Sequence, residues 1–214
     1  MERANEVLEF WFGRGPWDEA RLAERSRFWF GASDPPAAIA ERDALIRTTL
    51  EPMLERAARG EFASWSASPR RRLALIILFD QVPRNAYRGT AAAFAFDREA
   101  LALSVEGLQL AADAALDPVE RLFFYLPLEH AESMEAQDAA VAAYERLVRE
   151  SPPGLKGFSE GALKYAHQHR DIIAKFGRFP HRNRVLERES TPAEVQWLAS
   201  GDTFGQYMGT FPDS

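Results

Sequence analysis

The stretch LALIILFDQVPRNAYRGT, residues 73–90, starts as an apolar segment and ends in charged and polar residues. Apolar residues lie seven, four and three positions before Asp80, a spacing that places them all on one face of a helix. We therefore predict a buried helix whose inner face carries Asp80. Because burial of an unpaired carboxylate is costly, the rest of the chain must supply partners for this side chain.

Two more ionisable groups share apolar helix faces. Glu129 follows apolar residues at the same three spacings, provided that the helix continues through Pro127. His169 precedes apolar residues by three, four and seven positions. The candidate partners are Arg84, Arg88 and the turn GRFPHRN, which contains Arg178, His181 and Arg182.

These groups have two interpretations. Buried ion pairs that join helices would explain each one alone, whereas several ionisable groups gathered in one place often mark a functional site. On the second interpretation, Asp80, Glu129 and His169 are the candidate catalytic residues, with acid–base chemistry on an anionic substrate. The anion would be held by arginines, which bind carboxylates or phosphates, and by the helix start after RGT (88–90).

Other chemistries have weaker support. A metal site of Glu129, His169 and His181 is conceivable, but the chain has neither an HExxH motif nor a repeated histidine spacing. Nucleotide-binding glycine motifs and the GxSxG nucleophile motif are also missing. We therefore expect no metal and no cofactor.

Helix signals recur along the chain and strand signals are almost absent. Capping residues before Pro69, Pro118 and Pro192 mark helix starts. Left-handed C-terminal caps are expected at Gly13, Gly31, Gly60 and Gly177. The predicted helices are residues 3–12, 18–30, 35–59, 69–82, 98–112, 118–130, 134–150, 160–176 and 192–199.

This pattern predicts an all-α fold built as an array of antiparallel helical hairpins. The strings EFWFG (9–13) and RFWFG (27–31) further predict that two consecutive helices pack their aromatic ends in one core. No long linker divides the chain, so residues 1–214 are expected to form a single domain, with a helical core at about 3–199 and a less regular tail at 200–214.

The composition limits the class of protein. Of 214 residues, 46% are hydrophobic and 27% charged, which is typical of a globular chain. The absence of cysteine excludes disulfides and thiolate chemistry, and the net charge of −6 argues against a nucleic-acid partner. No apolar run reaches the roughly 18 residues of a membrane span, and the charged N-terminus is unlike a signal peptide. We expect a soluble, cytoplasmic protein without a membrane partner.

Four segments together resemble a known family. They are VLEFWFG (7–13), LALIILFDQVPRNAYRGTAAAFAFD (73–97), RLFFYLPLEHAE (121–132) and HRDIIAKFGRFPHRNRVLERESTPAE (169–194). They are similar to the bacterial family catalogued as domain of unknown function 924. The resemblance implies a tetratricopeptide-like all-helical fold and assigns no activity. On the matching motif positions, it adds a set of candidate ligand-binding residues, whose members are Arg84, Asn85, Arg88, His130, Arg170, Arg178, His181 and Asn183.

Two functions follow as hypotheses. The first is a small-molecule enzyme or sensor, in which a pocket between helices holds an anionic ligand against Arg84, Arg88 and Arg178. Glu129 and His169 would then transfer protons. The second is a scaffold of stacked hairpins that binds a peptide or protein partner, with the motif residues along an open concave face.

Overall fold

The computed structural model describes residues 2–31 and 34–199, and these residues form helices and turns without any strand. The all-α prediction is therefore confirmed, while the predicted irregular tail from Ser200 lies outside the described residues. The α-helices are α1 (Glu2–Phe12), α2 (Glu19–Phe30), α3 (Pro36–Ala58), α4 (Pro69–Ile76), α5 (Val82–Ala86), α6 (Asp97–Gln109), α7 (Pro118–Glu129), α8 (Met134–Glu150), α9 (Lys156–Phe176) and α10 (Pro192–Ala199). Short 3₁₀ segments join them: η1 (Ala63–Ala67), η3 (Ala91–Phe94), η4 (Ala112–Ala115), η5 (Pro153–Leu155) and η6 (Pro180–Arg182).

Most predicted boundaries agree with the structure, and three details were wrong. The predicted helix 69–82 is divided into α4, the π-helical segment η2 (Ile77–Gln81) and α5. Helix α9 begins at Lys156, four residues before the predicted start. Gly31 has a φ of −69°, so it does not form the left-handed cap that Gly13, Gly60 and Gly177 adopt.

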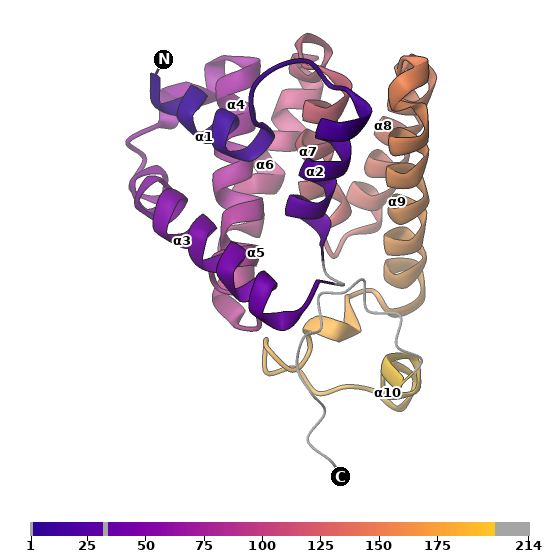
Figure 1. The fold of residues 1–214 in the computed structure, drawn as a ribbon. Helices are drawn as coiled ribbons and strands as arrows, with labels where there is room; N and C mark the ends of the chain where they lie inside the picture. Colours follow the sequence, from indigo (N-terminus) through magenta and orange to yellow (C-terminus); the bar gives the residue numbers. More distant parts are fainter. Residues whose placement is uncertain (1, 32–33, 200–214) are drawn as a thin grey trace.

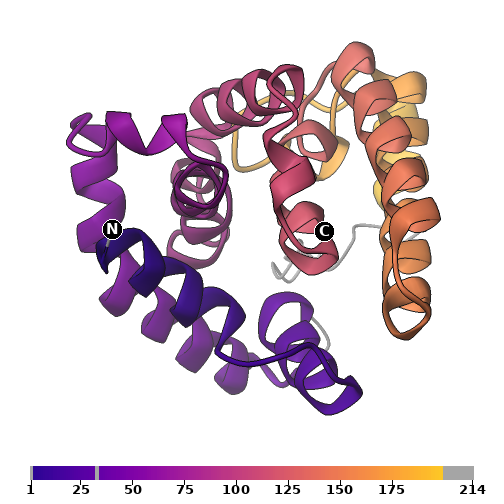
Figure 2. The same cartoon turned by 90° about the horizontal axis from the view of Figure 1, so that it is seen from above.

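The helices pack mainly against their neighbours in sequence. α8 and α9 lie side by side at one edge of the molecule in both views (Figures 1 and 2), in agreement with the predicted hairpins. α7 packs against α6, α8 and α9, and α4 packs against α1 and α6. α10 contacts η6 beyond the end of α9 (Figure 1). No helix within the described ranges is long and apolar enough to cross a membrane.

The aromatic ends of α1 and α2 share one core, as the repeated FWFG strings predict. The ring centroids of Phe12 and Trp29 are 5.9 Å apart, and both rings contact Phe123 of α7 edge-on. The indole N–H of Trp29 donates to the carbonyl of Trp11 at 2.9 Å. This contact satisfies a polar group that would otherwise be buried without a partner.

Candidate functional site

Asp80 lies in η2, where the chain departs from regular α-helix. Pro83 has no amide hydrogen, and in a regular helix its ring would collide with the carbonyl four residues earlier. The backbone widens instead, and the N–H of Val82 donates to the carbonyl of Ile77, five residues before it. Asp80 is 0% exposed, so the prediction that it faces the core is confirmed.

Three side chains hold the Asp80 carboxylate. The Nδ1 atom of His130 lies 2.8 Å from Asp80 Oδ1, Nη1 of Arg84 lies 3.1 Å from the same oxygen, and the Gln81 amide donates to the other oxygen. Burial alone would raise the pKa of Asp80, but Arg84 and His130 outweigh burial and hold it well below its usual range. Asp80 is therefore ionised, and because a carboxylate only accepts hydrogen bonds, Nδ1 of His130 carries the proton.

His130 is neutral in this environment. Burial and the nearby Arg84 guanidinium lower its pKa, although Asp80 acts in the opposite direction. With the proton on Nδ1, the Nε2 atom carries a lone pair, and no hydrogen bond within the described residues uses that atom. The ring is thus oriented by Asp80 with its second nitrogen available as a base.

Asp97, at the start of α6, joins two arginines. It accepts from Nη1 and Nη2 of Arg84 at 2.7 and 3.0 Å, and Nη1 of Arg182 lies 3.4 Å from its Oδ2 atom. Burial lowers the pKa of Arg84, but Asp80 and Asp97 outweigh burial and raise it. Arg84 is therefore a firmly charged link between the two carboxylates.

Glu129 and His169 form a second acid–histidine pair. Glu129 is the last residue of α7, and its Oε1 atom lies 3.0 Å from Nδ1 of His169 on α9. Both side chains are buried, which confirms the predicted orientation of each. Burial and the neighbouring Glu129 carboxylate raise the pKa of the Tyr144 hydroxyl on α8 well above its usual range.

The two pairs meet through aromatic contacts. The rings of His130 and His169 have centroids 6.3 Å apart, and the ring of Phe179 lies 5.6 Å from His169. The ring of Phe179 also contacts the guanidinium of Arg182, at 4.4 Å. Arg182 in turn contacts Asp97, Asp97 binds Arg84, and Arg84 contacts Asp80, so the contacts form a closed circuit. We call the seven ionisable residues of this circuit the charged cluster; they are Asp80, Arg84, Asp97, Glu129, His130, His169 and Arg182.

Among the described residues, Arg182 leaves two adjacent nitrogens of its guanidinium without a partner, whereas Arg84 leaves only its Nε atom. Arg182 is 3% exposed, and its guanidinium lies between the rings of Phe94 and Phe179 at 4.7 and 4.4 Å. Its Nε and Nη2 atoms are buried and have no hydrogen-bond partner within the described residues. Burial and the like charge of Arg84 lower the pKa of Arg182 to about 10. Buried donors of this kind are rare in folded proteins.

Three of the predicted anion-binding arginines do not reach the cluster. Arg88 is paired with Asp43 of α3 at 2.6 and 2.9 Å. Arg178 is paired with Glu194 of α10 at 2.7 and 2.8 Å, and its guanidinium lowers the pKa of Glu194 to about 2. Arg170 is paired with Asp138 of α8 at 2.6 Å. Each cation thus pairs with a carboxylate from another element, and the structure does not bring these three together with Arg84.

The remaining predicted ligand residues have structural contacts. Asn85 donates to the carbonyl of Gln81 and accepts from Arg88. Asn183 donates to Ser190 at 3.0 Å, and His181 lies beside the ring of Phe179, with centroids 5.4 Å apart.

The turn RGT lacks the features from which an anion site was predicted there. Its Arg88 binds Asp43, the segment that follows is a 3₁₀ turn rather than an α-helix, and Thr90 caps none of its amides.

No group of three or more metal-ligating side chains occurs within the described part of the chain. The arrangement of Glu129, His169 and His181 considered from the sequence is therefore not a metal centre in these residues. The chemistry that this region offers is that of charges, histidines and hydrogen-bond donors.

Two members of the cluster were missed as site residues, namely Asp97 and Arg182. Asp97 begins a helix at the end of the motif AFAFD, where an acidic residue reads as an ordinary helix-start preference. Arg182 was recognised only as one of several possible partners for a buried carboxylate. Its position in the short segment PHR, three residues after the buried Phe179, was the available signal.

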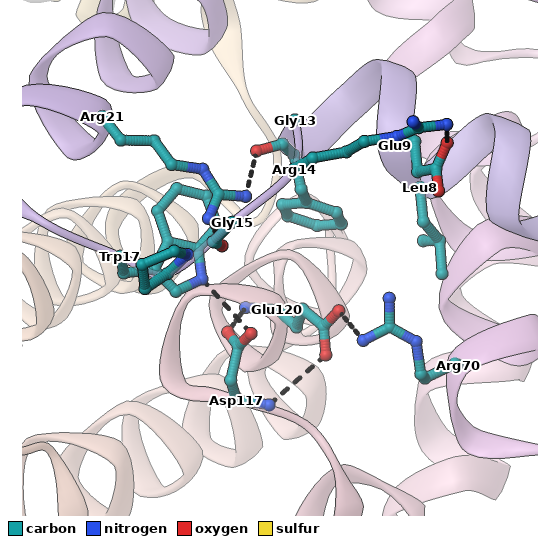
Figure 3. A pocket seen from close by; sticks show the side chains of 12 residues that line it. Leu8, Glu9, Gly13, Arg14, Gly15, Trp17, Arg21, Arg70, Asp117 and Glu120 are labelled. Carbon is teal, nitrogen blue, oxygen red and sulfur yellow. Dashed lines mark hydrogen bonds and ion pairs between the residues drawn. The ribbon is translucent and has the colours of Figure 1, made fainter.

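A separate cavity of about 370 Å³ opens at the other end of α7 (Figure 3). Among its lining residues are Phe12, Trp17, Arg21, Arg70, Asp117 and Glu120. Its carboxylates are all engaged: Asp117 accepts from the Trp17 indole and caps α7, and Glu120 pairs with Arg70 at 2.5 Å. The buried Nε of Arg21 also has no partner within the described residues, but both Nη atoms of that side chain donate to backbone carbonyls, so the cavity has no pair of adjacent open donors like that of Arg182.

Comparison with known proteins identifies relatives without a known activity. A model of the family described as "Bacterial protein of unknown function (DUF924)" matches residues 7–202. A solved structure of a protein of unknown function from Agrobacterium tumefaciens is 34% identical in sequence, covers 94% of this chain and 98% of its own, and superposes with a TM-score of 0.75. No curated protein matches the chain.

Proposed function

Because the chain belongs to the bacterial family of unknown function DUF924, its activity must be inferred from the site itself, and we propose that the charged cluster binds a small organic anion and transfers a proton on it. The observation that carries this proposal is the buried pair of Asp80 and His130. An ionised carboxylate fixes Nδ1 at 2.8 Å, and the lowered pKa of His130 keeps the ring neutral. This is the arrangement that a histidine general base requires.

Charge complementarity supports an anionic substrate. Arg84 and Arg182 are two buried cations within reach of one carboxylate, Asp97, and Arg84 also contacts Asp80. A negatively charged ligand beside them would be stabilised in this low-dielectric setting far more than in water. His130, which contacts Asp80 beside Arg84, would then act on a proton of that ligand.

A purely structural role for the cluster is the competing interpretation. It accounts for the pairs themselves, since buried carboxylates need partners. It does not account for Arg182, because a guanidinium that serves only stability would not leave two adjacent buried donors without partners. The unpartnered Nε and Nη2 atoms are therefore the reason to favour a ligand.

The scaffold hypothesis stays a prediction with less support. It requires the motif residues to lie along an open concave face. Asp80, Glu129, His130 and His169 are instead all less than 10% exposed. A peptide on the surface would not touch these side chains.

The test is a binding and exchange assay on the full chain. A panel of small carboxylates and phosphates is screened for stabilisation against thermal unfolding, and each stabilising compound is incubated with the protein in D₂O. We expect at least one compound to exchange a carbon-bound proton for deuterium, as seen by loss of its ¹H NMR signal.

The variant H130Q should lose this exchange, whereas R170Q, on the surface pair with Asp138, should retain it. Absence of stabilisation across the whole panel, or exchange by H130Q at the rate of the unmodified protein, would rule the proposal out.

A further inference from the structure

The proposed function leaves open which anionic group the cluster holds and which atoms hold it. Building on that function, we infer that the ligand carries a carboxylate and that this carboxylate binds the Nε and Nη2 edge of Arg182. The inference starts from the geometry of the guanidinium. Nη1 of Arg182 is directed to Asp97, and the two atoms without partners are the other two nitrogens.

Nε and Nη2 form one edge of the planar guanidinium, and their N–H bonds point in nearly the same direction. This is the fork that takes the two oxygens of a carboxylate in parallel. Another arginine of the charged cluster already binds a carboxylate through two nitrogens, because Asp97 accepts from Nη1 and Nη2 of Arg84 at 2.7 and 3.0 Å. One arginine fork in the cluster is therefore filled by a carboxylate of the protein, and the other is open.

The surroundings of Arg182 suit a flat group. The central carbon of the guanidinium lies over the rings of Phe94 and Phe179, 4.7 and 4.4 Å from their centroids. A carboxylate bound in the plane of the guanidinium is itself flat. Beside two aromatic rings it needs less room than a tetrahedral group does.

The balance of charge favours a single negative charge over two. Arg84 and Arg182 are the two arginines of the charged cluster, and the carboxylates of Asp80, Asp97 and Glu129 already oppose them, so a second negative charge on the ligand would meet more repulsion than the first. All the Nη atoms of Arg84 are engaged, so Arg182 alone has donors on both a Nε and a Nη atom to offer. A phosphate carries close to two charges at neutral pH and would face Asp97 without a second open cation.

A ligand can reach the Nε and Nη2 edge of Arg182 from the side of Asp97. The Asp97 side chain is 28% exposed, the largest exposed fraction in the charged cluster. Its contact with Arg182, at 3.4 Å, is longer than its contacts with Arg84. Arg182 is thus the loosely held partner, and it can turn toward a ligand carboxylate while Asp97 stays on Arg84.

The experiment follows the side-chain Nε–H signal of Arg182 by ¹H–¹⁵N NMR while acetate, succinate or inorganic phosphate is added to the full chain at pH 7. Acetate and succinate should shift this signal in a saturable way, and phosphate should bind at least threefold more weakly than succinate. The variant R182K keeps the charge but loses the fork, and it should bind succinate at least tenfold more weakly. R178K, in the same turn but paired with Glu194, is the matched control and should bind succinate unchanged.

Three results would each overturn the inference. The Arg182 signal could stay unshifted while succinate binds saturably, R182K could bind succinate as tightly as the unmodified protein, or phosphate could bind more tightly than succinate. If R182K does not fold, the Arg182 signal in the unmodified protein decides alone. The proposed catalysis is judged separately with H130Q, which should bind succinate within threefold of the unmodified protein. Binding at Arg182 without proton exchange would refute the proposed catalysis and support this inference. Proton exchange without any shift of the Arg182 signal would support the catalysis and refute this inference.

Discussion

The hydrogen bond between His130 and Asp80 joins two side chains whose pKa values are both lowered. For Asp80 the lowering means that the charged form is favoured, and for His130 it means that the neutral form is favoured. The pair is therefore a charged acceptor and a neutral donor at neutral pH. Its geometry orients the imidazole without giving it a charge, which leaves it able to accept a proton.

Replacing the acceptor should destabilise the fold. In D80N, buried Arg84 loses one of its two counter-charges, and breaking a buried ion pair by removing one partner costs about 3–5 kcal/mol. We expect the free energy of unfolding, measured with urea, to fall by about this amount. D138N removes an exposed carboxylate that pairs with Arg170, and its effect should stay below about 1 kcal/mol. Equal effects of D80N and D138N would show that the buried charge is not held by these contacts.

The lowered pKa of His130 predicts a pH dependence with a definite sign. In the unfolded chain His130 titrates at its ordinary pKa of 6.5, whereas in the fold it takes up a proton only at lower pH. Below about pH 6.5 the unfolded chain therefore binds more protons, and stability falls as the pH falls. Denaturation between pH 7 and pH 5 should show a shallower loss of stability for H130Q than for the unmodified protein. An unchanged slope in H130Q would contradict the assignment.

For individual residues, the sequence predicted which side chains face the core but not which of them contact one another. Helical spacing placed Asp80, Glu129 and His169 on apolar faces, and all three are buried. Spacing contains no information about contacts between distant segments, such as Arg182 with Asp97, 85 residues apart. The arginines were also numerous, so their partners could be identified only from the fold.

The π-helical segment is the element that positions Asp80. If Pro83 causes it, P83A should let the segment return to regular α-helix, and Asp80 would rotate by about 100° per residue of shifted register. The hydrogen bond to His130 would then break. We expect the His130 Nδ1–H signal, seen by NMR as a slowly exchanging proton, to disappear in P83A. P52A, at a proline inside α3, should retain it; its persistence in P83A would show that packing alone holds the segment.

The start of α7 provides a second test at the level of elements. Asp117 accepts from the amides of Val119 and Glu120 and also from the Trp17 indole. D117A should lower the free energy of unfolding by about 1–2 kcal/mol. Ser68 also precedes a proline at a helix start, but its side chain makes no capping hydrogen bond, so S68A should change stability by less than about 0.5 kcal/mol. Thermal or urea unfolding of both variants distinguishes real caps from positions that only resemble them.

Helix existence and most boundaries followed from the sequence because prolines, caps and periodic apolar residues give strong local signals. The structure differs from the predicted helices where one local sequence signal is compatible with two structures. Pro83 was compatible with a continuing helix or with a π segment, and the residues around Gly157 were predicted to precede the helix 160–176, although α9 already runs through them. Tertiary contacts of α9 with α8 decide that case.

At the level of the whole molecule, α7 connects two regions of different character. Its first turn borders the open cavity at Glu120, and its last residue, Glu129, belongs to the charged cluster. These positions are about 14 Å apart along the helix, given the rise of 1.5 Å per residue. The cavity has paired carboxylates, whereas the charged cluster contains Arg182, the one described side chain with two buried donors that lack partners. Among the described residues, the place where a ligand has most to satisfy is therefore the charged cluster.

The most direct measurement of whether that place serves function is the stability of R182M. Methionine preserves the contacts with Phe94 and Phe179 and removes a buried cation with two unpartnered donors, while Asp97 keeps its pair with Arg84. If Arg182 is present for a ligand, R182M should raise the free energy of unfolding by about 1 kcal/mol or more and should no longer bind succinate. A clear loss of stability in R182M, with succinate binding unchanged, would show instead that Arg182 belongs to the framework of the fold.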